Sequence, residues 1–332
     1  MSAGTGSTAR TGFETRVLAV RDLSPTVREI ALAPPAPPQR WTVGSHLRVQ
    51  VALPGSRTGE RRYSLVGLPA PDAPWRIAVK RVAASRGGSA HMWTLAAGDT
   101  VRILALANHF ELPAAPRPTL LVAGGIGVTP LLGMALALAG RGADVRMAYA
   151  ARAAADLVYA DTLQAALGDR LKLHAGERGE RMDLPQLIAS LPADGQVMAC
   201  GPVRLLHALQ TAWSDAGRPT QRLRIETFGT SGELPAERFW VDVPRHGLRF
   251  TVAADESLLD AMERHGVACL ADCLRGECGL CAVDVVAIHG RADHRDVFLT
   301  PAEQRSGKRL CACVSRVAGG GVVLDSAWRP DT

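Results

Sequence analysis

The chain of 332 residues has no apolar run of about 18 residues, so we expect no membrane-spanning helix. Residues 1–12 are small and polar and lack the apolar core of a secretory signal, and we expect them to form a disordered tail. No run of Lys and Arg is flanked by aromatic residues, which argues against a nucleic-acid ligand despite the net charge of +6. Seven cysteines without an export signal indicate a reducing compartment, and we expect the cytoplasm.

A second Cys-x2-Cys pair is also missing, and this bears on the cysteines that are present. Cys273, Cys278 and Cys281 share one short segment, and Cys311 and Cys313 follow later. Cys-x4-Cys-x2-Cys with a distant fourth Cys is the plant-type spacing for a 2Fe–2S cluster. Zinc is the alternative, but zinc ribbons pair two short Cys hairpins, and a long chain without a secretory signal is a poor candidate for a disulfide framework. The spacing therefore predicts an iron–sulfur site.

Two glycines, Gly276 and Gly279, separate the clustered cysteines. A loop that supplies three thiolates to one cluster must turn tightly and bring backbone N–H groups close to the sulfurs. We therefore expect positive φ or close backbone approach at these glycines.

Residues 13–115 are rich in short β-type runs separated by Pro and Gly clusters, which predicts an antiparallel β-barrel or sandwich. Residues 61–65 (Arg-Arg-Tyr-Ser-Leu) offer an Arg that can pair a phosphate, a Tyr that can lie on a ring and a hydroxyl that can bond a ring nitrogen. Residues 78–80 (Ala-Val-Lys) and 87–89 (Gly-Gly-Ser) follow, and the two glycines before a hydroxyl can form an amide nest for phosphate. Each signal alone has a plainer alternative, a solvated strand face or an ordinary loop.

Residues 116–228 alternate short buried strands with helices, which indicates a parallel α/β sheet. A strand over 119–123 leads into 124–130 (Gly-Gly-Ile-Gly-Val-Thr-Pro) and then a helix, as in phosphate-binding doubly wound folds, but the strict G-x-G-x-x-G fingerprint is absent. A later strand ends in 200–202 (Cys-Gly-Pro). Because ligands bind at the carboxyl ends of such strands, both segments are candidate nucleotide contacts. A small buried hydrophobe is an equal alternative for Cys200.

The remaining residues predict a linker over 229–238 and a small α+β domain over 239–332. Within this domain we expect a hairpin over 239–252, a helix over 257–265 capped by Ser257 or Asp255, and a final strand over 322–325. The expected fold is therefore multidomain.

With these segments in hand, the chain resembles the phthalate dioxygenase reductase family, flavin-dependent iron–sulfur reductases that feed Rieske oxygenases. The resemblance implies an FMN-binding β-barrel (13–115), an NADH-binding α/β domain (116–228) and a β-grasp-like ferredoxin domain (239–332). It covers nearly everything after residue 13 and rests on motifs in family order at 61–65, 78–80, 87–89, 124–130, 200–202, 225–228 (Ile-Glu-Thr-Phe), 292–296 (Ala-Asp-His-Arg-Asp) and 313–316 (Cys-Val-Ser-Arg).

The resemblance also implies roles for individual residues. Ser64 should lie near the reactive ring nitrogen of FMN, Cys200 near the nicotinamide and Phe228 over the isoalloxazine, which makes these three the residues expected at the reacting groups. The family pattern Arg-x-Tyr-Ser leaves Arg62 in the variable position. The full set expected to contact FMN or NADH is Arg61, Arg62, Tyr63, Ser64, Leu65, Val79, Lys80, Gly87, Gly88, Ser89, Gly125, Ile126, Gly127, Thr129, Cys200, Gly201, Pro202 and Phe228.

The fourth cluster ligand has two candidates. The family's Cys-Val-Ser-Arg pattern points to Cys313, whereas Cys311 has the plant-ferredoxin separation from Cys281, with 29 residues (282–310) between them. We expect Cys273, Cys278, Cys281 and Cys313 to bind the cluster, because loop length tolerates change better than a local motif. Residues two apart share a strand face, so geometry alone does not exclude Cys311.

The resemblance implies an enzyme, the NADH-dependent reductase component of a Rieske non-haem iron aromatic-ring oxygenase or O-demethylase. Electrons would pass from NADH through FMN and the cluster to the oxygenase, its protein partner, and we expect a monomer. The alternatives are a reductase serving a haem monooxygenase or other acceptor, FAD in place of FMN, and a zinc- or redox-sensing module without flavin turnover. The resemblance favours NADH, although Arg152 lies where it can reach the 2′-phosphate of NADPH.

Overall fold

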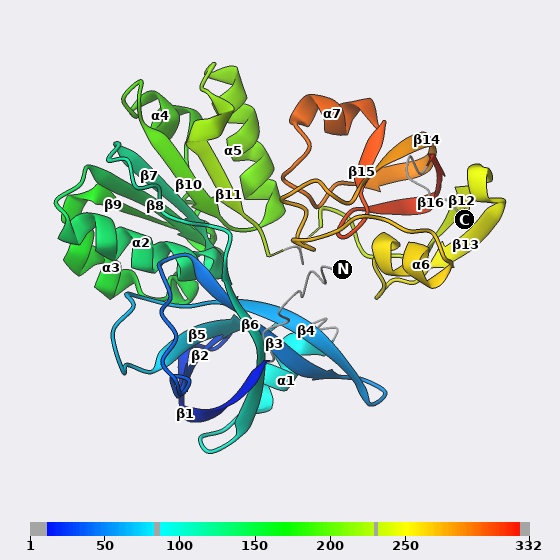
Figure 1. Cartoon of the computed structure of the whole chain (residues 1–332). Coiled ribbons are helices and arrows are strands. Elements are labelled where there is room, and N and C mark those ends of the chain that lie inside the picture. The colour runs from blue at the N-terminus through cyan, green and yellow to red at the C-terminus, as the bar shows by residue number, and fades with distance from the viewer. Residues whose placement is uncertain (1–11, 83–86, 229–231, 326–332) are drawn as a thin grey trace, which may run out of the picture. The chain divides into compact units, whose positions relative to one another are not determined.

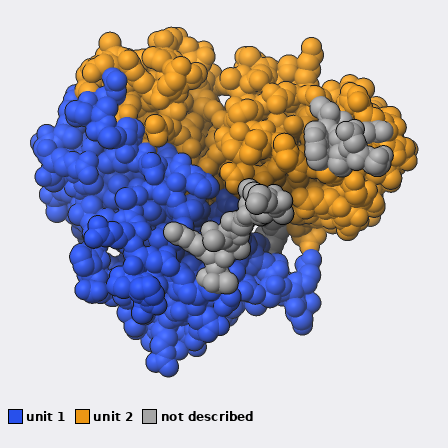
Figure 2. Space-filling view, in the orientation of Figure 1, with its two compact units in different colours: residues 1–117, 128–180 blue, residues 118–127, 181–332 orange. Residues whose placement is uncertain are grey.

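The structure is a computed structural model that describes residues 12–82, 87–228 and 232–325. Most of the expected tail (1–12) and the start of the expected linker (229–238) fall outside these residues. The chain divides into two compact units, the first made of residues 1–117 and 128–180 and the second of 118–127 and 181–332 (Figure 2). Among the described residues, no helix is long and apolar enough to cross a membrane.

The first unit begins with an antiparallel six-stranded sheet in the order β4-β3-β6-β1-β2-β5 (Figure 1). A bridge between Leu65 and Ile77 joins the two outer strands, so the sheet closes into the predicted barrel. Inward side chains such as Ile30, Leu47 and Ile103 are fully buried. The elements are β1 (Phe13–Ser24), β2 (Val27–Leu32), β3 (Ser45–Leu53), β4 (Arg57–Ser64), β5 (Trp75–Lys80), α1 (Gly88–Thr94) and β6 (Thr100–Asn108).

A parallel five-stranded sheet follows, in the order β11-β10-β7-β8-β9. The first unit holds α2 (Val128–Gly140), β8 (Val145–Ala151), α3 (Ala160–Leu167) and β9 (Leu171–Ala175). The second unit holds β7 (Thr119–Gly124), η1 (Gly125–Gly127), α4 (Leu184–Ala189), β10 (Gln196–Cys200), α5 (Val203–Asp215) and β11 (Leu223–Glu226). Strands β7 and β10 are buried along their whole length, as expected for parallel strands covered on both faces.

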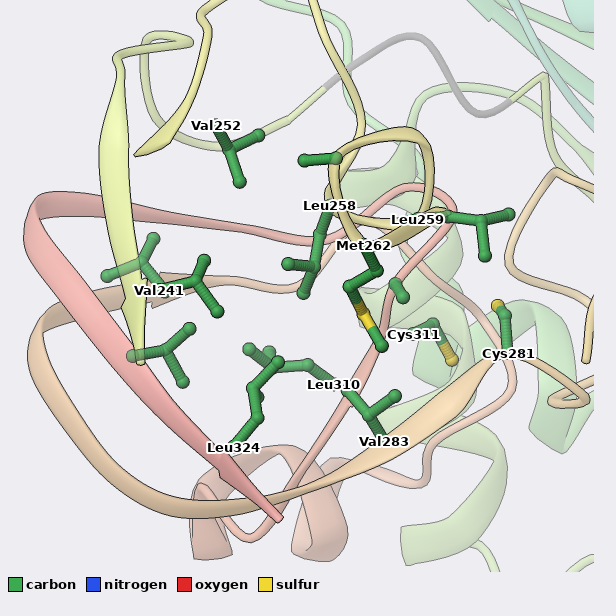
Figure 3. Packing of buried hydrophobic residues seen from close by; sticks show 14 of the residues in the cluster. Val241, Val252, Leu258, Leu259, Met262, Cys281, Val283, Leu310, Cys311 and Leu324 are labelled. Atoms are coloured by element: carbon green, nitrogen blue, oxygen red, sulfur yellow. The ribbon is translucent and has the colours of Figure 1, made fainter. Parts of the chain in front are cut away.

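The C-terminal sheet has the order β13-β12-β16-β14-β15 and also belongs to the second unit. Its elements are β12 (Phe239–Val243), β13 (Leu248–Val252), α6 (Leu258–Arg264), β14 (Ala282–Asp293), α7 (Pro301–Ser306), β15 (Arg309–Cys311) and β16 (Arg316–Asp325). Ser257 caps α6 in a reciprocal capping box with Asp260, as the sequence predicts. Side chains from α6 and from strands such as β12 and β16 form one apolar core, with Val241, Met262 and Leu324 inside it (Figure 3).

The last strand is longer than predicted. The expected strand over 322–325 begins at Arg316 and runs through Gly319, Gly320 and Gly321. A triple glycine normally breaks a strand. Here Gly319 has φ 71°, and Gly320 lies so close to the carbonyl of His289 on β14 that a Cβ would be 2.0 Å from its oxygen. The glycines therefore permit an irregular, closely paired section of strand.

Candidate functional site

The clustered cysteines lie on a loop between α6 and β14, which we call the cluster loop (residues 269–281). Leu274, Gly276 and Gly279 have φ of 52°, 75° and 75°. A Cβ at Gly276 would lie 2.7 Å from the Cα of Asp296, and one at Gly279 would lie 2.2 Å from the ring of Phe298. The path of the loop therefore requires both glycines, as their position between the cysteines predicts.

The sulfur of Cys273 lies inside a ring of backbone donors. The N–H groups of Arg275, Glu277 and Cys278 donate to its Sγ at 3.4, 3.3 and 3.4 Å. Cys273 is buried, whereas Cys278 is exposed. N–H donors of this kind stabilise the negative charge on thiolates and tune the potential of iron–sulfur clusters.

The remaining cysteines of the site meet where β14 begins and β15 ends. The Sγ atoms of Cys281 and Cys313 are 3.1 Å apart. Cys311 is fully buried in the apolar core, and Cys313 is half-buried. Hydrogen bonding among these three thiols lowers the pKa of Cys281 and raises the pKa values of Cys311 and Cys313. Thiol sulfurs are the donors that an iron–sulfur cluster requires, so the residues present fit a cluster.

Zinc would need its ligands around a single point, whereas a 2Fe–2S cluster divides four thiolates between two irons. In the described part of the chain, no three His, Cys, Asp or Glu side chains converge closely enough to hold one metal ion.

In the first unit, the structure brings together two segments that the sequence singles out separately. Arg61 on β4 lies over the turn that opens α1, where a Cβ at Gly88 would be 2.4 Å from Arg61 Nε. Gly87 in this turn has φ 98°. The hydroxyl of Ser64, at the end of β4, is buried and makes no hydrogen bond to a described residue. A buried hydroxyl without a partner suits a ligand that supplies one, so these residues fit a bound flavin phosphate and ring.

Other predicted flavin contacts have different neighbours. The side chains of Leu65 and Val79 belong to the barrel core, so only their backbone can face a ligand. Lys80 Nζ lies 3.5 Å from Asp156 Oδ2. Burial raises the pKa of the Tyr63 hydroxyl. The Nε of Arg62 lies 3.4 Å from a carboxylate oxygen of Glu60. The hydroxyl of Ser89 accepts a hydrogen bond from the N–H of Val82 at 3.4 Å.

Asp156 is a residue that sequence reasoning missed. Its carboxylate accepts hydrogen bonds from Ser24 at 2.8 Å and Thr26 at 2.6 Å, and Lys80 is its cationic neighbour. These bonds tie η2 (Ala154–Asp156) to the first two strands of the barrel within the first unit. No local pattern signals a contact between residues so far apart in sequence.

The nucleotide segments at the ends of β7 and β10 touch each other. A Cβ at Gly127 would lie 2.2 Å from the carbonyl oxygen of Cys200, and one at Gly124 would lie 2.6 Å from Pro202 Cδ. The contact leaves no room for side chains there, which suits a close approach of backbone to ligand. Burial, followed by the nearby carboxylates of Glu226 and Glu277, raises the pKa of Cys200, so its thiol is neutral.

The other predicted nucleotide contacts differ in exposure. Gly125 and Ile126 are half-buried, Gly201 is buried and Pro202 is exposed. Thr129 is buried in the first turn of α2, in the first unit, and Phe228 follows β11 as a half-buried side chain. Each of these residues lies at or just beyond the carboxyl end of a strand, where nucleotide ligands bind in such sheets.

Comparison with known proteins identifies the family. Residues 241–318 match the model of the 2Fe-2S iron-sulfur cluster binding domain. The chain is 40% identical over 318 residues to the heme-dependent oxidative N-demethylase beta subunit of Ectopseudomonas mendocina (strain ymp), covering 94% of this chain and 98% of that protein. It is also 40% identical over 296 residues to a toluene-4-sulfonate monooxygenase system reductase subunit of Comamonas testosteroni, covering 86% and 89%.

The decisive structural likeness is to the solved phthalate dioxygenase reductase, described as a modular structure for electron transfer from pyridine nucleotides to [2Fe-2S]. The TM-score is 0.69 at 27% identity, over 95% of this chain and 98% of that one. The chain belongs to the phthalate dioxygenase reductase family. It is therefore an oxidoreductase, the reductase component of an oxygenase system, and the predicted fold and cofactor classes (a flavin, NADH and a 2Fe–2S cluster) are confirmed.

Proposed function

We propose that this phthalate dioxygenase reductase-type chain uses FMN and passes electrons from NADH to a Rieske non-haem iron aromatic-ring oxygenase or O-demethylase. The observation that carries the proposal is the arrangement of sulfurs: three N–H groups surround Cys273, and Cys281 faces Cys313 at 3.1 Å. Cys273, Cys278, Cys281 and Cys313 are the proposed ligands. The proposed domains are the FMN barrel (13–115), the NADH domain (116–228), the linker (229–238) and the ferredoxin domain (239–332).

FMN, when bound, supplies the conversion between the two-electron hydride of NADH and the single electrons that a cluster carries. The residues of the chain would position the flavin and shield its ring from solvent. Arg61, which lies over Gly88, is the proposed partner of the flavin phosphate. The hydroxyl of Ser64, which makes no hydrogen bond to a described residue, is the proposed partner of the ring. Phe228 is the proposed cover of the ring face. The thiol of Cys200 is neutral, so it would place no charge beside a bound nicotinamide.

A haem protein is a second candidate for the electron acceptor. It is favoured by the 40% identity, over almost the full length of both chains, to a protein named as a subunit of a heme-dependent oxidative N-demethylase. Reduction of a purified Rieske oxygenase and of a purified haem oxygenase, each supplied with NADH and this reductase, separates the two. We further propose a monomer that works in a reducing compartment such as the cytoplasm, where ligand thiols stay free.

Anaerobic NADH titration of the purified protein tests the electron route. We expect flavin bands and a broad iron–sulfur absorbance that both bleach, and release of FMN on acid treatment. Flavin without iron would contradict the cluster, and iron without flavin would contradict the roles of Arg61 and Ser64.

Substitution Arg61→Gln is expected to weaken flavin binding by about tenfold to a hundredfold, since hydrogen bonds to charged groups contribute about 1.5–3 kcal/mol. The measurement is flavin affinity of the deflavinated protein by fluorescence quenching. Arg57→Gln is the matched control, because Arg57 lies on the same strand but is exposed, and its Nε donates to the carbonyl of Pro54 at 3.3 Å. Equal loss in both variants would show that general surface charge, not Arg61 itself, holds the flavin.

A further inference from the structure

The cluster loop carries a buried arginine that the cluster ligands do not explain. Arg275 lies between Cys273 and Cys278, and its side chain is only 5% exposed. Its Nη1 is 2.7 Å from Oε1 of Glu226, and its Nη2 is 2.8 Å from Oε2 of Glu277. The Glu226 side chain is 1% exposed and that of Glu277 is 15% exposed. One guanidinium therefore bridges two carboxylates away from water.

The two carboxylates belong to different structural elements. Glu226 is the last residue of β11, next to the proposed nucleotide site, because the register pairs it with Cys200 of β10. Glu277 belongs to the cluster loop and accepts a hydrogen bond from the N–H of Thr227 at 2.7 Å. Thr227 directly precedes Phe228. Arg275 thus joins the cluster loop to the strand end that leads into the proposed flavin cover.

Arg275 also contacts a proposed cluster ligand through its backbone. Its N–H donates to Cys273 Sγ, while its side chain holds Glu226. A chain of contacts therefore links Cys200 to the sulfur of Cys273. Cys200 on β10 pairs with Glu226 on β11, Glu226 forms an ion pair with Arg275, and the N–H of Arg275 bonds the sulfur. All of these residues lie in the second unit.

A second set of hydrogen bonds joins α5 to residues 296–297, which in turn bond the cluster loop. His207 Nε2 lies 2.8 Å from the carbonyl oxygen of Asp296, and Gln210 donates to the carbonyl of Val297 at 2.8 Å. The N–H of Val297 in turn donates to the carbonyl of Gly276 at 2.9 Å. The cluster loop is therefore linked to β11 through the Arg275 ion pairs and to α5 by way of residues 296–297.

Buried ion pairs are weak evidence for stability, because desolvation offsets most of their attraction, but they do specify geometry. The planar fork of Arg fixes direction as well as distance between two carboxylates, and a Lys ammonium does not. A substitution that keeps charge but loses the fork therefore separates positioning from electrostatics.

We propose that Arg275 is a positioning residue for electron transfer, which fixes the cluster loop to the carboxyl end of β11 through Glu226 and Glu277. The inference rests on the proposed function, since it assigns the device to the step between flavin and cluster. Hydride transfer from NADH does not use this attachment.

The test compares Arg275→Lys and Arg275→Gln with wild type in the full-length, cofactor-loaded protein. Rapid mixing with NADH follows flavin bleaching and cluster bleaching separately, and a redox titration monitored by electron paramagnetic resonance gives the cluster potential. We expect cluster reduction to slow several-fold in both variants, because the rate of electron transfer falls steeply as the distance between donor and acceptor grows. Flavin bleaching is expected to stay at the wild-type rate. The potential is expected to stay near wild type in the Lys variant and to fall in the Gln variant.

A wild-type rate of cluster reduction in Arg275→Lys would overturn the proposal, because charge alone would then suffice. Arg295→Gln is the matched control: Arg295 is buried in the same unit, pairs Asp293 at 2.6 Å and bonds the carbonyl of Leu234. An equal slowing in Arg295→Gln would indicate general destabilisation and would also overturn it.

Hydrogen–deuterium exchange provides a readout that needs no turnover. Exchange at 225–228 and 273–278 is expected to speed up in both Arg275 variants and not in Arg295→Gln. Unchanged exchange contradicts the attachment even if the wild type proves to lack flavin. Absence of flavin or cluster from the wild type contradicts the proposed function instead, so the two failures are distinguishable.

Discussion

Substitution Cys278→Ser is expected to abolish electron transfer to one-electron acceptors that take electrons from the cluster, while NADH-dependent bleaching of the flavin stays intact. Cys278 is exposed on the cluster loop, and it contributes a backbone N–H to Cys273 as well as its own sulfur. Serine keeps the N–H and removes the thiolate, which is the ligand that iron–sulfur clusters require. The measurements are flavin bleaching by rapid mixing with NADH, and steady reduction of a one-electron acceptor.

The control for this experiment is Cys269→Ser. Cys269 is a half-buried cysteine of the same loop outside the proposed ligand set, and its Sγ lies 3.6 Å from the carbonyl oxygen of Leu270. Wild-type behaviour in both assays is expected of this variant. Loss of flavin bleaching together with acceptor reduction in Cys278→Ser would mean that hydride transfer also depends on the cluster loop, against the proposed division between the two steps.

Much of the fold could be predicted because its signals lie within short stretches of sequence. The barrel appears as short β runs with turn residues between them, and the cluster loop as cysteines separated by glycines that must adopt φ near 75°. The capping box at Ser257 and Asp260 spans only four residues. The start of β16 was predicted too late because glycines normally break strands. Close pairing with β14 explains why the glycines are tolerated, and this pairing is made by a distant part of the chain that no local pattern reveals.

Parts of the site that depend on distant pairs could not be predicted. Glu226 and Arg275 are 49 residues apart, and Asp156 lies 130 residues from Thr26. Nothing in the sequence near either residue distinguishes a buried ion pair from a solvated charge. One sequence signal could have pointed to the ion pair of Arg275. An Arg between two cluster cysteines lies on a tight loop, and a charge buried there needs a partner of opposite sign.

The choice between Cys313 and Cys311 as fourth ligand predicts opposite results for two serine variants. The Sγ of Cys313 is 3.1 Å from that of Cys281, and the residue is half-buried at the edge of the site. Cys311 is fully buried in the apolar core, and Figure 3 shows it beside Leu310 and Met262. We therefore expect Cys313→Ser to lose the cluster, seen as loss of iron, sulfide and the paramagnetic signal of the reduced protein.

Cys311→Ser is expected to keep the cluster and to lower the free energy of unfolding by about 1–3 kcal/mol, since it places a hydroxyl among apolar side chains. Thermal unfolding of the loaded protein measures this cost, and iron content is the matched readout for both variants. A small shift in cluster potential is also expected, because Cys311 donates a hydrogen bond that lowers the pKa of Cys281. If Cys311→Ser loses its iron while Cys313→Ser retains it, the spacing from Cys281 was the better guide, and Cys311 turns out of the core to bind the cluster.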